Sequence, residues 1–548
     1  MKSDIEIARE AALLPIAEVA EKLGLKEEDY DCYGKYKAKI KIRPASSDGR
    51  LVLVTAMNPT PFGEGKTTVS IGLADAFHKL GIKVCLALRE PSLGPVFGIK
   101  GGACGGGYSQ IAPMEDINLH FNGDLHAVTY ANDLLSALID NHIMQGNELG
   151  IDKVVWTRCI DLNDRALRVA DVALGGVKNG VPRRDGFVIT AASEMMAILC
   201  LADSLSDLKR RLGNILIGYD KSGKEITVSD LACQDSLAIL LKDALNPNLV
   251  QTLEGTPAIV HGGPFANIAH GCNTVTATRM ALALSDVTVT EAGFGAELGA
   301  EKFFDIKCRK TGLNPSATVL VITLRSIKHN AGVPADKITL PDEEAIKKGF
   351  ANVARHIKNL RSEFSQNVVV ALNRFPTDTP EEIALAEKLC KEENVGFAVS
   401  EGFAKGGEGC INLAEAVLSA MEKPSVLTLT YDDNYTIKQK IEAVATKIYG
   451  AKSVTYSENA EKTLAALDEK YRSFPVCIAK TQYSFSADPT LLGAPENFDL
   501  NVEEIMVRAG AEFIVVRCGQ MLLMPGLSKQ PNAMKMTIDD DGTVNGLM

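Results

Sequence analysis

A glycine-rich loop between an apolar run and an amphipathic segment constrains the fold of this chain more than any other feature. Residues 51–56 (LVLVTA) form the apolar run, which is typical of a strand buried on both faces of a parallel sheet. The loop TPFGEGKT at 60–67 matches the phosphate-loop pattern G-x-x-x-x-G-K-[ST], except that Thr60 replaces the first glycine. The pattern predicts a strand that leads through a phosphate-binding loop into a helix.

The segment after the loop completes a strand, helix, strand unit. Residues 67–80 carry apolar side chains at helical spacing, among them Ile71 and Phe77. Gly81 favours a helix end before the next apolar run, IKVCLAL. Further apolar runs alternate with helical segments and lie at 256–260, 287–290, 318–323 and 368–372. We therefore predict an α/β protein, P-loop NTPase-like, with a mostly parallel doubly wound sheet flanked by helices and two smaller α/β lobes.

Changes in this alternation indicate more than one region. A chain of 548 residues also exceeds the length at which a single hydrophobic core stops growing and chains divide into domains. We expect a large nucleotide-binding domain at 1–360 that contains the loop and a helical insertion at about 145–250. A second α/β region should span 361–424, and a C-terminal α/β lobe should span 425–548. Residues 4–30 are predicted to form a helical hairpin packed on the main body.

The composition excludes several classes of protein. With 46% hydrophobic and 23% charged residues the chain is an ordinary globular protein, and its net charge of −11 gives no bulk attraction for nucleic acid or anionic lipid. The first 25 residues place charges every few positions and hold no apolar run suited to a signal peptide or membrane helix. Twelve cysteines stand without a CxxC pair. We expect a cytoplasmic protein with free thiols and no membrane or nucleic-acid partner.

The residues of the loop predict nucleotide binding. Gly63 and Gly65 let backbone amides turn toward a polyphosphate, while Lys66 places a cation against it. Thr67 is the natural hydroxyl ligand for magnesium. The alternative is a glycine-rich turn without a ligand, and the flanking strand and helix argue against it. The residues assigned to the nucleotide are Thr60, Pro61, Phe62, Gly63, Glu64, Gly65, Lys66, Thr67 and Thr68.

An arginine follows the next predicted strand. Ligands of open α/β sheets lie beyond the carboxyl ends of the strands, so Arg89 should project into the same crevice as Lys66. An arginine there would hold a carboxylate or phosphate through two parallel hydrogen bonds. The alternative is a surface arginine in a loop. The glycines of 101–107, later in the same segment, suggest either a mobile lid or a backbone anion nest.

An acidic residue ends a later strand. The run SDVTVTEAGFG places Glu291 at the strand end, where an acid typically holds magnesium through water opposite the lysine loop. We choose Glu291 as the metal ligand together with Thr67, and Asp286 is the reserve. A solvated loop glutamate is the alternative.

Four histidines are candidates for the substrate site. His120 and His126 flank Asp124 in HFNGDLH, a set too small for a zinc site, so hydrogen bonding to a substrate competes with a structural role. The segment HGGPFANIAHG raises the same choice for His261 and His270, and its paired glycines favour an active-site loop.

Two phenylalanines follow strand-like runs in polar loops. Phe375 lies in NRFPTDT and Phe403 in SEGFAKGGEG. They could form two walls around a flat heterocycle, because aromatic stacking adds roughly 0.5–1.5 kcal/mol beyond the buried area. By residue type alone, two ordinary core phenylalanines remain the alternative.

The chain as a whole resembles the formate–tetrahydrofolate ligase family in its monofunctional form. The resemblance rests on stretches that run in the family's order from about residue 55 to 527. They are TPFGEGKTT, LREPSLGPVFGIKGGA, FNGDLHAVTYANDLL, ITAASEMMAILCLA, HGGPFANIAHGCN, TEAGFGAELGAEKFFDIKCR, NRFPTDT, AKGGEG, AKTQYSFS and MPGL.

This resemblance implies a three-domain ligase that uses ATP and Mg²⁺, is often stimulated by K⁺ or NH₄⁺, and is usually a homotetramer. It implies that formate and tetrahydrofolate, in some cases polyglutamylated, are the substrates. It also implies that Lys66 and Arg89 bind an acyl phosphate and that Phe375 belongs to the folate pocket. One departure stands out: Phe403 occupies the position before AKGGEG where the family commonly has tryptophan.

The residues and the resemblance together predict a two-step reaction. Formate attacks the γ-phosphorus of ATP to give formyl phosphate, and tetrahydrofolate then takes the formyl group to give 10-formyltetrahydrofolate. His126 is the candidate base. The alternatives are a nucleotide-dependent switch or scaffold that makes no small-molecule product, and a ligase that activates another carboxylate, as a cyclo-ligase does.

Overall fold

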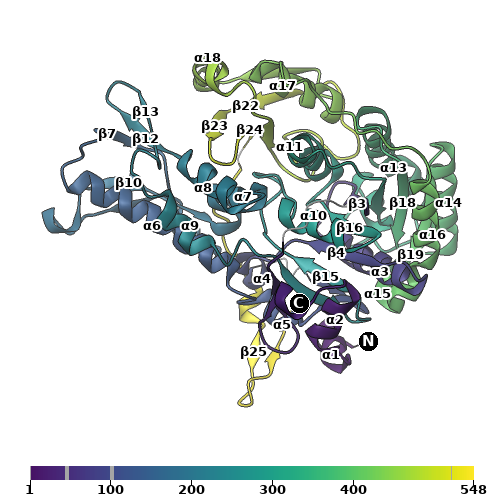
Figure 1. The fold of residues 1–548 in the computed structure, drawn as a ribbon. Coiled ribbons are helices and arrows are strands. Elements are labelled where there is room, and N and C mark those ends of the chain that lie inside the picture. The colour runs from purple at the N-terminus through teal and green to yellow at the C-terminus, as the bar shows by residue number, and fades with distance from the viewer. Residues whose placement is uncertain (1, 43–47, 99–103, 520, 548) are drawn as a thin grey trace.

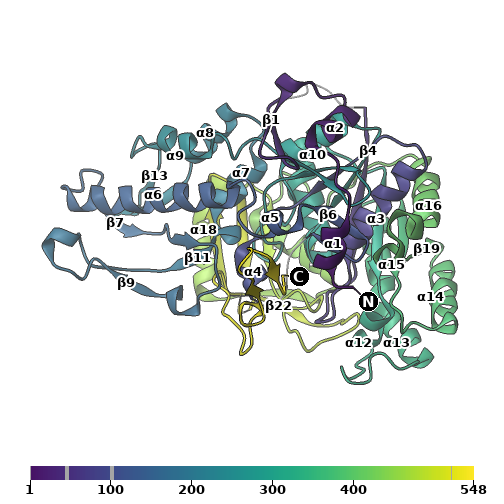
Figure 2. The ribbon, with the colours of Figure 1, turned by 90° about the horizontal axis from the view of Figure 1, so that it is seen from below.

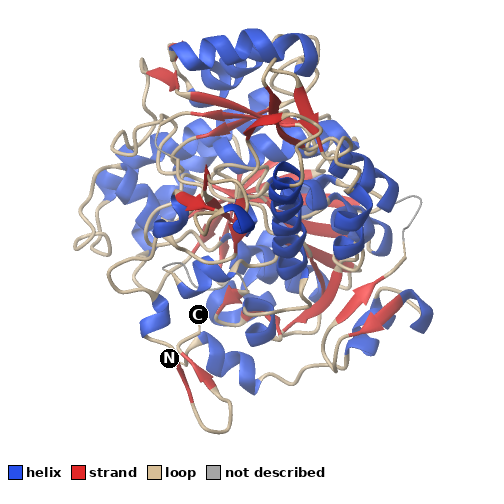
Figure 3. Cartoon of the chain, turned by 90° about the vertical axis from the view of Figure 1, so that its left-hand side faces the viewer, coloured by secondary structure: helices blue, strands red, loops and turns tan. Residues whose placement is uncertain are grey.

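The computed structural model describes residues 2–42, 48–98, 104–519 and 521–547, and one large sheet runs through the body of the molecule (Figure 1). Helices pack on both faces of the sheet, as Figure 3 shows with helices in blue and strands in red. Its strands lie in the order β1 (Tyr30–Cys32), β2 (Ala38–Ile40), β14 (Asn248–Thr252), β15 (Pro257–Val260), β4 (Val84–Leu88), β16 (Val287–Glu291), β3 (Arg50–Ala56), β17 (Ala317–Ile322), β18 (Val368–Asn373) and β19 (Gly396–Ser400).

Most of this sheet is parallel. Every neighbouring pair from β15 to β19 is parallel, whereas the pairs among β1, β2, β14 and β15 are antiparallel. Two short strands, β5 (Gly105–Gly106) and β6 (Ser109–Ala112), join the antiparallel edge through β14. The prediction of a large, mostly parallel α/β sheet is confirmed, with an antiparallel edge that the sequence did not reveal.

The central strand β3 is buried on both faces, as its unbroken apolar run predicted. Leu51 and Leu53 belong to the core on one face, and Val52 and Val54 belong to the core on the other. Side chains alternate along a strand, so each face must be covered by other elements. Helices α3 (Lys66–Lys79) and α16 (Ile411–Met421) cover one face, and α13 (Glu343–Lys358) packs against the other.

The remaining helices surround this core. They are α1 (Asp4–Glu10), α2 (Ile16–Lys22), α4 (Leu93–Phe97), α5 (Met114–Asn118), α6 (Asp124–Met144), α7 (Glu194–Leu201), α8 (Leu205–Gly213), α9 (Gln234–Leu241), α10 (Val275–Leu284), α11 (Arg309–Thr311), α12 (Leu324–Asn330), α14 (Pro380–Glu392), α15 (Gly402–Lys405), α17 (Ile437–Ala443) and α18 (Glu458–Tyr471). The expected hairpin at 4–30 is two short helices, and Pro15 caps the second one in an extended conformation. Residues 30–32 already form β1.

The stretch at about 145–250 differs from the helical insertion that we expected. Helices α7, α8 and α9 lie there among the short strands β7 (Ile151–Val154), β8 (Arg158–Ile160), β9 (Ala170–Val172), β10 (Arg183–Asp185), β11 (Phe187–Ile189), β12 (Leu216–Asp220) and β13 (Glu225–Thr227). Strands of three to five residues are too short to show a period of two, which is why the sequence pattern missed them. In Figure 2, α6 and β9 extend away from the body on the left.

The segment after residue 424, where we expect a smaller α/β lobe, contains helices and short strands of its own. Its strands are β20 (Ser453–Tyr456), β21 (Val476–Ala479), β22 (Asp499–Val502), β23 (Glu504–Arg508) and β24 (Phe513–Arg517), in a two-stranded and a three-stranded sheet beside α17 and α18. A last hairpin pairs β25 (Thr537–Ile538) with β26 (Val544–Asn545). The twelve cysteines are all free, as expected. Among the described residues, none of the helices combines the length and apolar character needed to cross a bilayer.

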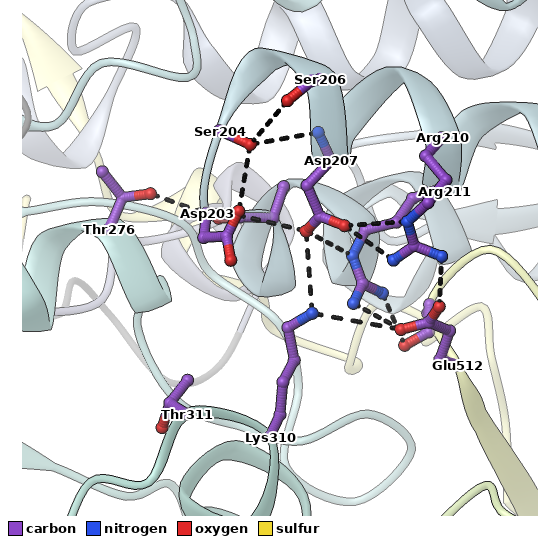
Figure 4. A network of polar contacts seen from close by, with 12 residues as sticks. Asp203, Ser204, Ser206, Asp207, Arg210, Arg211, Thr276, Lys310, Thr311 and Glu512 are labelled. Carbon is purple, nitrogen blue, oxygen red and sulfur yellow. Dashed lines mark hydrogen bonds and ion pairs between the residues drawn. The ribbon is translucent and has the colours of Figure 1, made fainter.

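A buried arginine ties α8 to this lobe (Figure 4). Arg211 is fully buried; its Nε donates to Asp207 Oδ2 at 2.9 Å and its Nη2 donates to Glu512 Oε2 at 2.6 Å. Nη1 donates to the carbonyls of Gly510 and Ala511. Burial raises the pKa of Asp207, but Arg211 and Arg210 outweigh burial and hold that pKa at about 2.

We predict that Asp207→Asn lowers the stability of the protein. The folded pKa lies below the unfolded value of about 3.9, so the carboxylate contributes about 2–3 kcal/mol above pH 4, and this contribution is lost as the pH falls toward 2. Denaturant unfolding at pH 7 should show the loss, and the difference from the parent protein should shrink in acid. Asp203→Asn, at a carboxylate 43% exposed beside the same helix, is the control and should cost under about 0.5 kcal/mol.

Candidate active site

The phosphate loop connects the carboxyl end of β3 to the first turn of α3. Gly63 and Gly65 have φ values of 74° and 72°, the left-handed region that glycine adopts without strain. Gly65 is the N-cap of α3, and Lys66 is its first residue. A Cβ atom at Gly65 would also lie 2.3 Å from Nδ2 of Asn373. The backbone amides at this helix start and the Lys66 ammonium together make a site suited to an anion.

The other predicted loop residues have different surroundings. Thr60, Glu64 and Thr68 are buried, whereas Pro61 is exposed. Phe62 is half-buried and meets the His329 ring edge-on, with 6.3 Å between the ring centres. The Glu64 carboxylate turns back into the loop, where its Oε1 accepts hydrogen bonds from the backbone N–H and the hydroxyl of Thr60.

Charged groups from the loop itself and from the ends of neighbouring strands shift the pKa of Lys66. Burial lowers the pKa of its ammonium, the carboxylates of Glu64 and Glu291 raise it, and Arg89 lowers it. These four side chains therefore share one electrostatic environment. The residues that the sequence placed in one crevice are brought together by the fold.

Glu291 lies between the two cations. Strand β16 pairs with β3 on one side and β4 on the other, so its last residue, Glu291, falls between the elements that carry Lys66 and Arg89. Glu291 Oε2 accepts a hydrogen bond of 2.9 Å from the Thr67 hydroxyl, and Oε1 lies 3.8 Å from Arg89 Nη2. Asp286, the reserve choice, is exposed and precedes β16 at the opposite end of the sheet, so it is not part of this cluster.

The segment 261–271 borders Arg89, as its glycines suggested. Arg89 Nη1 donates to the carbonyl of Pro264 at 3.3 Å. Its Nη1 also lies 2.8 Å from the point where a Cβ atom at Gly293 would stand, so Gly293 leaves room for the guanidinium. Arg89 Nε is buried and has no hydrogen-bond partner among the described residues. The guanidinium thus keeps donor capacity for a bound anion.

The predicted histidines fall into two groups. His120 and His126 stack, with Nδ1 of the first 2.8 Å from Nε2 of the second. His261 is fully buried, and its ring nitrogens bond the Thr274 hydroxyl and the Ala244 carbonyl. His270 is also fully buried, and burial together with Lys307 and Arg89 lowers its pKa to about 3. His270 is therefore neutral at physiological pH.

His126 lies close enough to Asp161 to lower the pKa of that carboxyl, which burial raises. Asp161 accepts hydrogen bonds from the Ser92 hydroxyl and the Leu93 N–H, in the segment that follows Arg89. The structure thus places Asp161 against the segment that follows Arg89, with the histidine pair in its electrostatic surroundings. The first two glycines of the predicted lid or nest, at positions 101 and 102, lie outside the described residues.

The two phenylalanines follow neighbouring parallel strands. Phe375 follows β18 and Phe403 follows β19, so both lie beyond the same edge of the sheet. The Phe375 ring packs under Arg325, whose Cζ is 4.1 Å from the ring centre. Phe403 is 38% exposed and packs on Gly106 and Gly107, and its carbonyl accepts a hydrogen bond from Tyr108 N–H.

Comparisons with known proteins identify the family of the chain. The family model described as formate–tetrahydrofolate ligase matches residues 2–548. The chain is 59% identical to the formate–tetrahydrofolate ligase of Campylobacter concisus over 548 residues, with 100% of each chain covered. It is 56% identical to the enzyme of the same name from Campylobacter curvus over 549 residues, again with 100% of each chain covered. The chain belongs to the formate–tetrahydrofolate ligase family.

Sequence reasoning missed several residues of the candidate site in this member of the formate–tetrahydrofolate ligase family. Asn373 ends β18 and donates from Nδ2 to the Glu64 carbonyl at 3.1 Å. Ser326 and Arg325, at the start of α12, contact the phosphate loop and Phe375. The sequence held a signal for each of these residues, because they are polar and lie at or just after the carboxyl ends of β17 and β18. Arg89 and Glu291 lie at the corresponding ends of β4 and β16.

We predict that Gly65→Ala raises the KM for ATP by about tenfold or more. A left-handed φ costs an alanine roughly 1 kcal/mol, and the clash with Asn373 adds to that cost where the loop must hold its shape. Steady-state kinetics with varied ATP provide the measurement. Gly81→Ala is the matched control, since Gly81 has φ 80° but open space around its Cβ position. An equal change of KM in both variants would show that strain alone, and not the Asn373 contact, matters.

Proposed function

We propose that this protein joins formate to tetrahydrofolate with ATP, giving 10-formyltetrahydrofolate, ADP and phosphate through formyl phosphate. The observation that carries the proposal is the cluster in which Glu291 contacts Thr67 and lies 3.8 Å from Arg89, beside Lys66. A phosphate loop next to a second cation suits a phosphorylated small acid. Full-length identity to enzymes named for this reaction supports the same choice. The strand, loop and helix at 50–79 support the finer assignment to the P-loop NTPase-like class.

The first step activates formate. A formate oxygen attacks the γ-phosphorus of ATP and forms the new O–P bond, while the bond from that phosphorus to the β,γ-bridging oxygen breaks and ADP leaves. Negative charge spreads over the phosphoryl oxygens, and the Lys66 ammonium with the loop amides is placed to stabilise it. Burial lowers the pKa of Lys66, but the bound phosphates favour its protonated form.

Magnesium fits the side chains at this position. Thr67 supplies a hydroxyl and Glu291 a carboxylate 2.9 Å apart, the hard oxygen donors that Mg²⁺ prefers beside nucleotide phosphates. Among the described residues no group of three or more His, Cys, Asp or Glu is arranged to hold a metal by itself, in keeping with an ion that arrives with the nucleotide. When bound, Mg²⁺ would neutralise phosphate charge.

The second step transfers the formyl group. N10 of tetrahydrofolate attacks the carbonyl carbon of formyl phosphate, the C–O bond to phosphate breaks, and the N10 proton is lost. Arg89 holds the phosphate end, and its donor capacity at Nε supports this role. Positioning supplies most of the rate, because an oriented neighbour contributes roughly 7–11 kcal/mol. His126, paired with His120, remains our candidate base.

We assign the folate pocket to the loops that follow the carboxyl ends of β18 and β19. Phe375 offers one ring face, since Arg325 covers the other. Phe403 is 38% exposed and available as a second wall. Its ring is smaller than the tryptophan common in the family, so we expect a smaller stacking contribution on that side.

Further properties are proposed from the family resemblance. They are stimulation by K⁺ or NH₄⁺, use of polyglutamylated folate and a homotetramer. A cytoplasmic location is proposed from the sequence of the first 25 residues. One structural feature supports self-association: exposed apolar side chains gather on the arm at 162–181, where Val177 is 90% and Leu174 is 71% exposed. Apolar groups grouped in this way mark surfaces that other proteins cover.

We predict that the acid-generated methenyl product forms only when formate, ATP and tetrahydrofolate are all present. Lys66→Ala should abolish both ATP turnover and a hydroxylamine-trappable formyl species, because charge on the phosphoryl oxygens loses its cation. Absorbance and trapping assays provide the measurements. ATP hydrolysis indifferent to formate and folate would instead favour a nucleotide-dependent switch, and turnover with another carboxylate would favour a different ligase. Undiminished trapping in Lys66→Ala would remove Lys66 from the first step.

We predict that Phe375→Ala raises the KM for tetrahydrofolate by about tenfold while formate-dependent phosphate transfer stays measurable. Loss of one stacked aromatic ring removes roughly 0.5–1.5 kcal/mol plus its buried area. Tyr435→Ala removes a ring that is 39% exposed in the loop before α17, and it serves as the control. An unaltered KM would exclude Phe375 from the pocket.

A further inference from the structure

Helix α12 contacts both the phosphate loop and the loop that carries Phe375. It begins directly after β17, between β3 and β18 in the sheet. Ser326 and Arg325 are adjacent in its first turn, and their side chains contact different loops. Ser326 is buried and reaches the phosphate loop, while Arg325 is half-buried and reaches Phe375.

On the nucleotide side, the contact runs through Glu64. Its Oε1 accepts three hydrogen bonds: 2.7 Å from the Thr60 N–H, 3.1 Å from the Thr60 hydroxyl and 3.2 Å from the Ser326 hydroxyl. Glu64 is only 4% exposed, and its carboxylate is enclosed between the phosphate loop and the start of α12. The residue that replaces the usual first glycine, Thr60, is thus one of the donors that fix the loop.

The Ser326 hydroxyl is itself held in place. It accepts a hydrogen bond of 2.8 Å from the hydroxyl of Thr323, which also caps α12 by accepting from the Ser326 N–H. Thr323 and Ser326 therefore form a relay that ends on Glu64 Oε1. A hydrogen bond to a charged, buried group is stronger than one between neutral groups, so this contact fixes the loop relative to the helix.

On the folate side, Arg325 holds the loop after β18. Its guanidinium covers one face of Phe375 at 4.1 Å, and its Nη2 donates to the Thr377 hydroxyl at 3.3 Å. The two loops are also connected directly, without α12. Asn373, two residues before Phe375, donates a hydrogen bond to the Glu64 carbonyl. The phosphate loop and the Phe375 loop thus share a common support.

We propose that Ser326 is a positioning residue that couples the nucleotide site to the folate site, without contact to either substrate. Ser326 fixes the phosphate loop through Glu64, and the neighbouring Arg325 fixes Phe375 on the same rigid helix start. The inference rests on the proposed function, which supplies the two ligands. Binding of ATP at the phosphate loop then changes the affinity for tetrahydrofolate at the Phe375 loop. By thermodynamic linkage, tetrahydrofolate changes the affinity for ATP by the same factor.

The experiment measures binding and does not require turnover. ATP affinity and tetrahydrofolate affinity are determined by calorimetry without formate, each alone and with the other ligand present. For Ser326→Ala we expect ATP affinity to fall by about tenfold, the loss of one hydrogen bond to a charged group. Tetrahydrofolate affinity should fall by about threefold, and the effect of each ligand on the other should disappear. Ser326→Thr, which keeps the hydroxyl, should restore the parent values.

Matched variants separate coupling from a general loss of structure. Arg325→Met should weaken tetrahydrofolate binding and leave ATP affinity within about twofold, because only Phe375 loses its partner. Glu64→Asp, whose shorter carboxylate no longer reaches Ser326, should repeat the Ser326→Ala pattern and replaces it if that variant does not fold. The inference is overturned if Ser326→Ala and Glu64→Asp change ATP affinity alone or leave the ligand coupling intact. Failure of the parent protein to bind tetrahydrofolate would instead refute the proposed function.

Discussion

The site depends on one constraint, the parallel alignment of β4, β16 and β3. Parallel neighbours end at the same edge of a sheet, so the residues that follow them must meet there. Arg89 follows β4, Glu291 ends β16, and Lys66 begins the helix after β3. The hydrogen bonds of the ladder, and not direct attraction between the charged groups, thus set their separation. A one-residue change of register would alter which side chain faces the crevice.

Glu291 also balances charge before any substrate binds. Lys66 and Arg89 would repel each other in a partly buried site, and the carboxylate between them reduces that repulsion. A phosphate that enters must compete with Glu291 for Arg89. The carboxylate then needs a new cation, and the Thr67 hydroxyl beside it completes a pair of donors for magnesium. The same residue therefore serves both the two cations and the proposed metal.

The sequence was sufficient for the parts that are set by local pattern. The apolar runs of 51–56 and of the later strands and the helical spacing after the loop were all visible in the sequence, and strand ends located Arg89 and Glu291. The sequence was not sufficient for contacts between residues that lie far apart along the chain. Nothing near Ser326 indicates that its hydroxyl reaches Glu64, 262 positions earlier. The strands of 151–227 were missed because short, partly exposed strands carry too little apolar pattern.

The long family motif that follows β16 contacts the residues just before the phosphate loop. Glu297 is fully buried and accepts a 2.7 Å hydrogen bond from Asn58, which stands just before the phosphate loop and also donates to the Gln482 carbonyl of the C-terminal lobe. Lys480 of that lobe is buried with its ammonium on the carbonyls of Thr481 and Ser484, and burial lowers its pKa while Glu297 opposes the shift. Buried charged groups are costly unless they are paired, so the Asn58 hydrogen bond and the nearby Lys480 ammonium offset part of the cost of burying Glu297. Asn58 therefore links the residues just before the phosphate loop both to Glu297 and to the C-terminal lobe, which becomes part of the architecture around the candidate site.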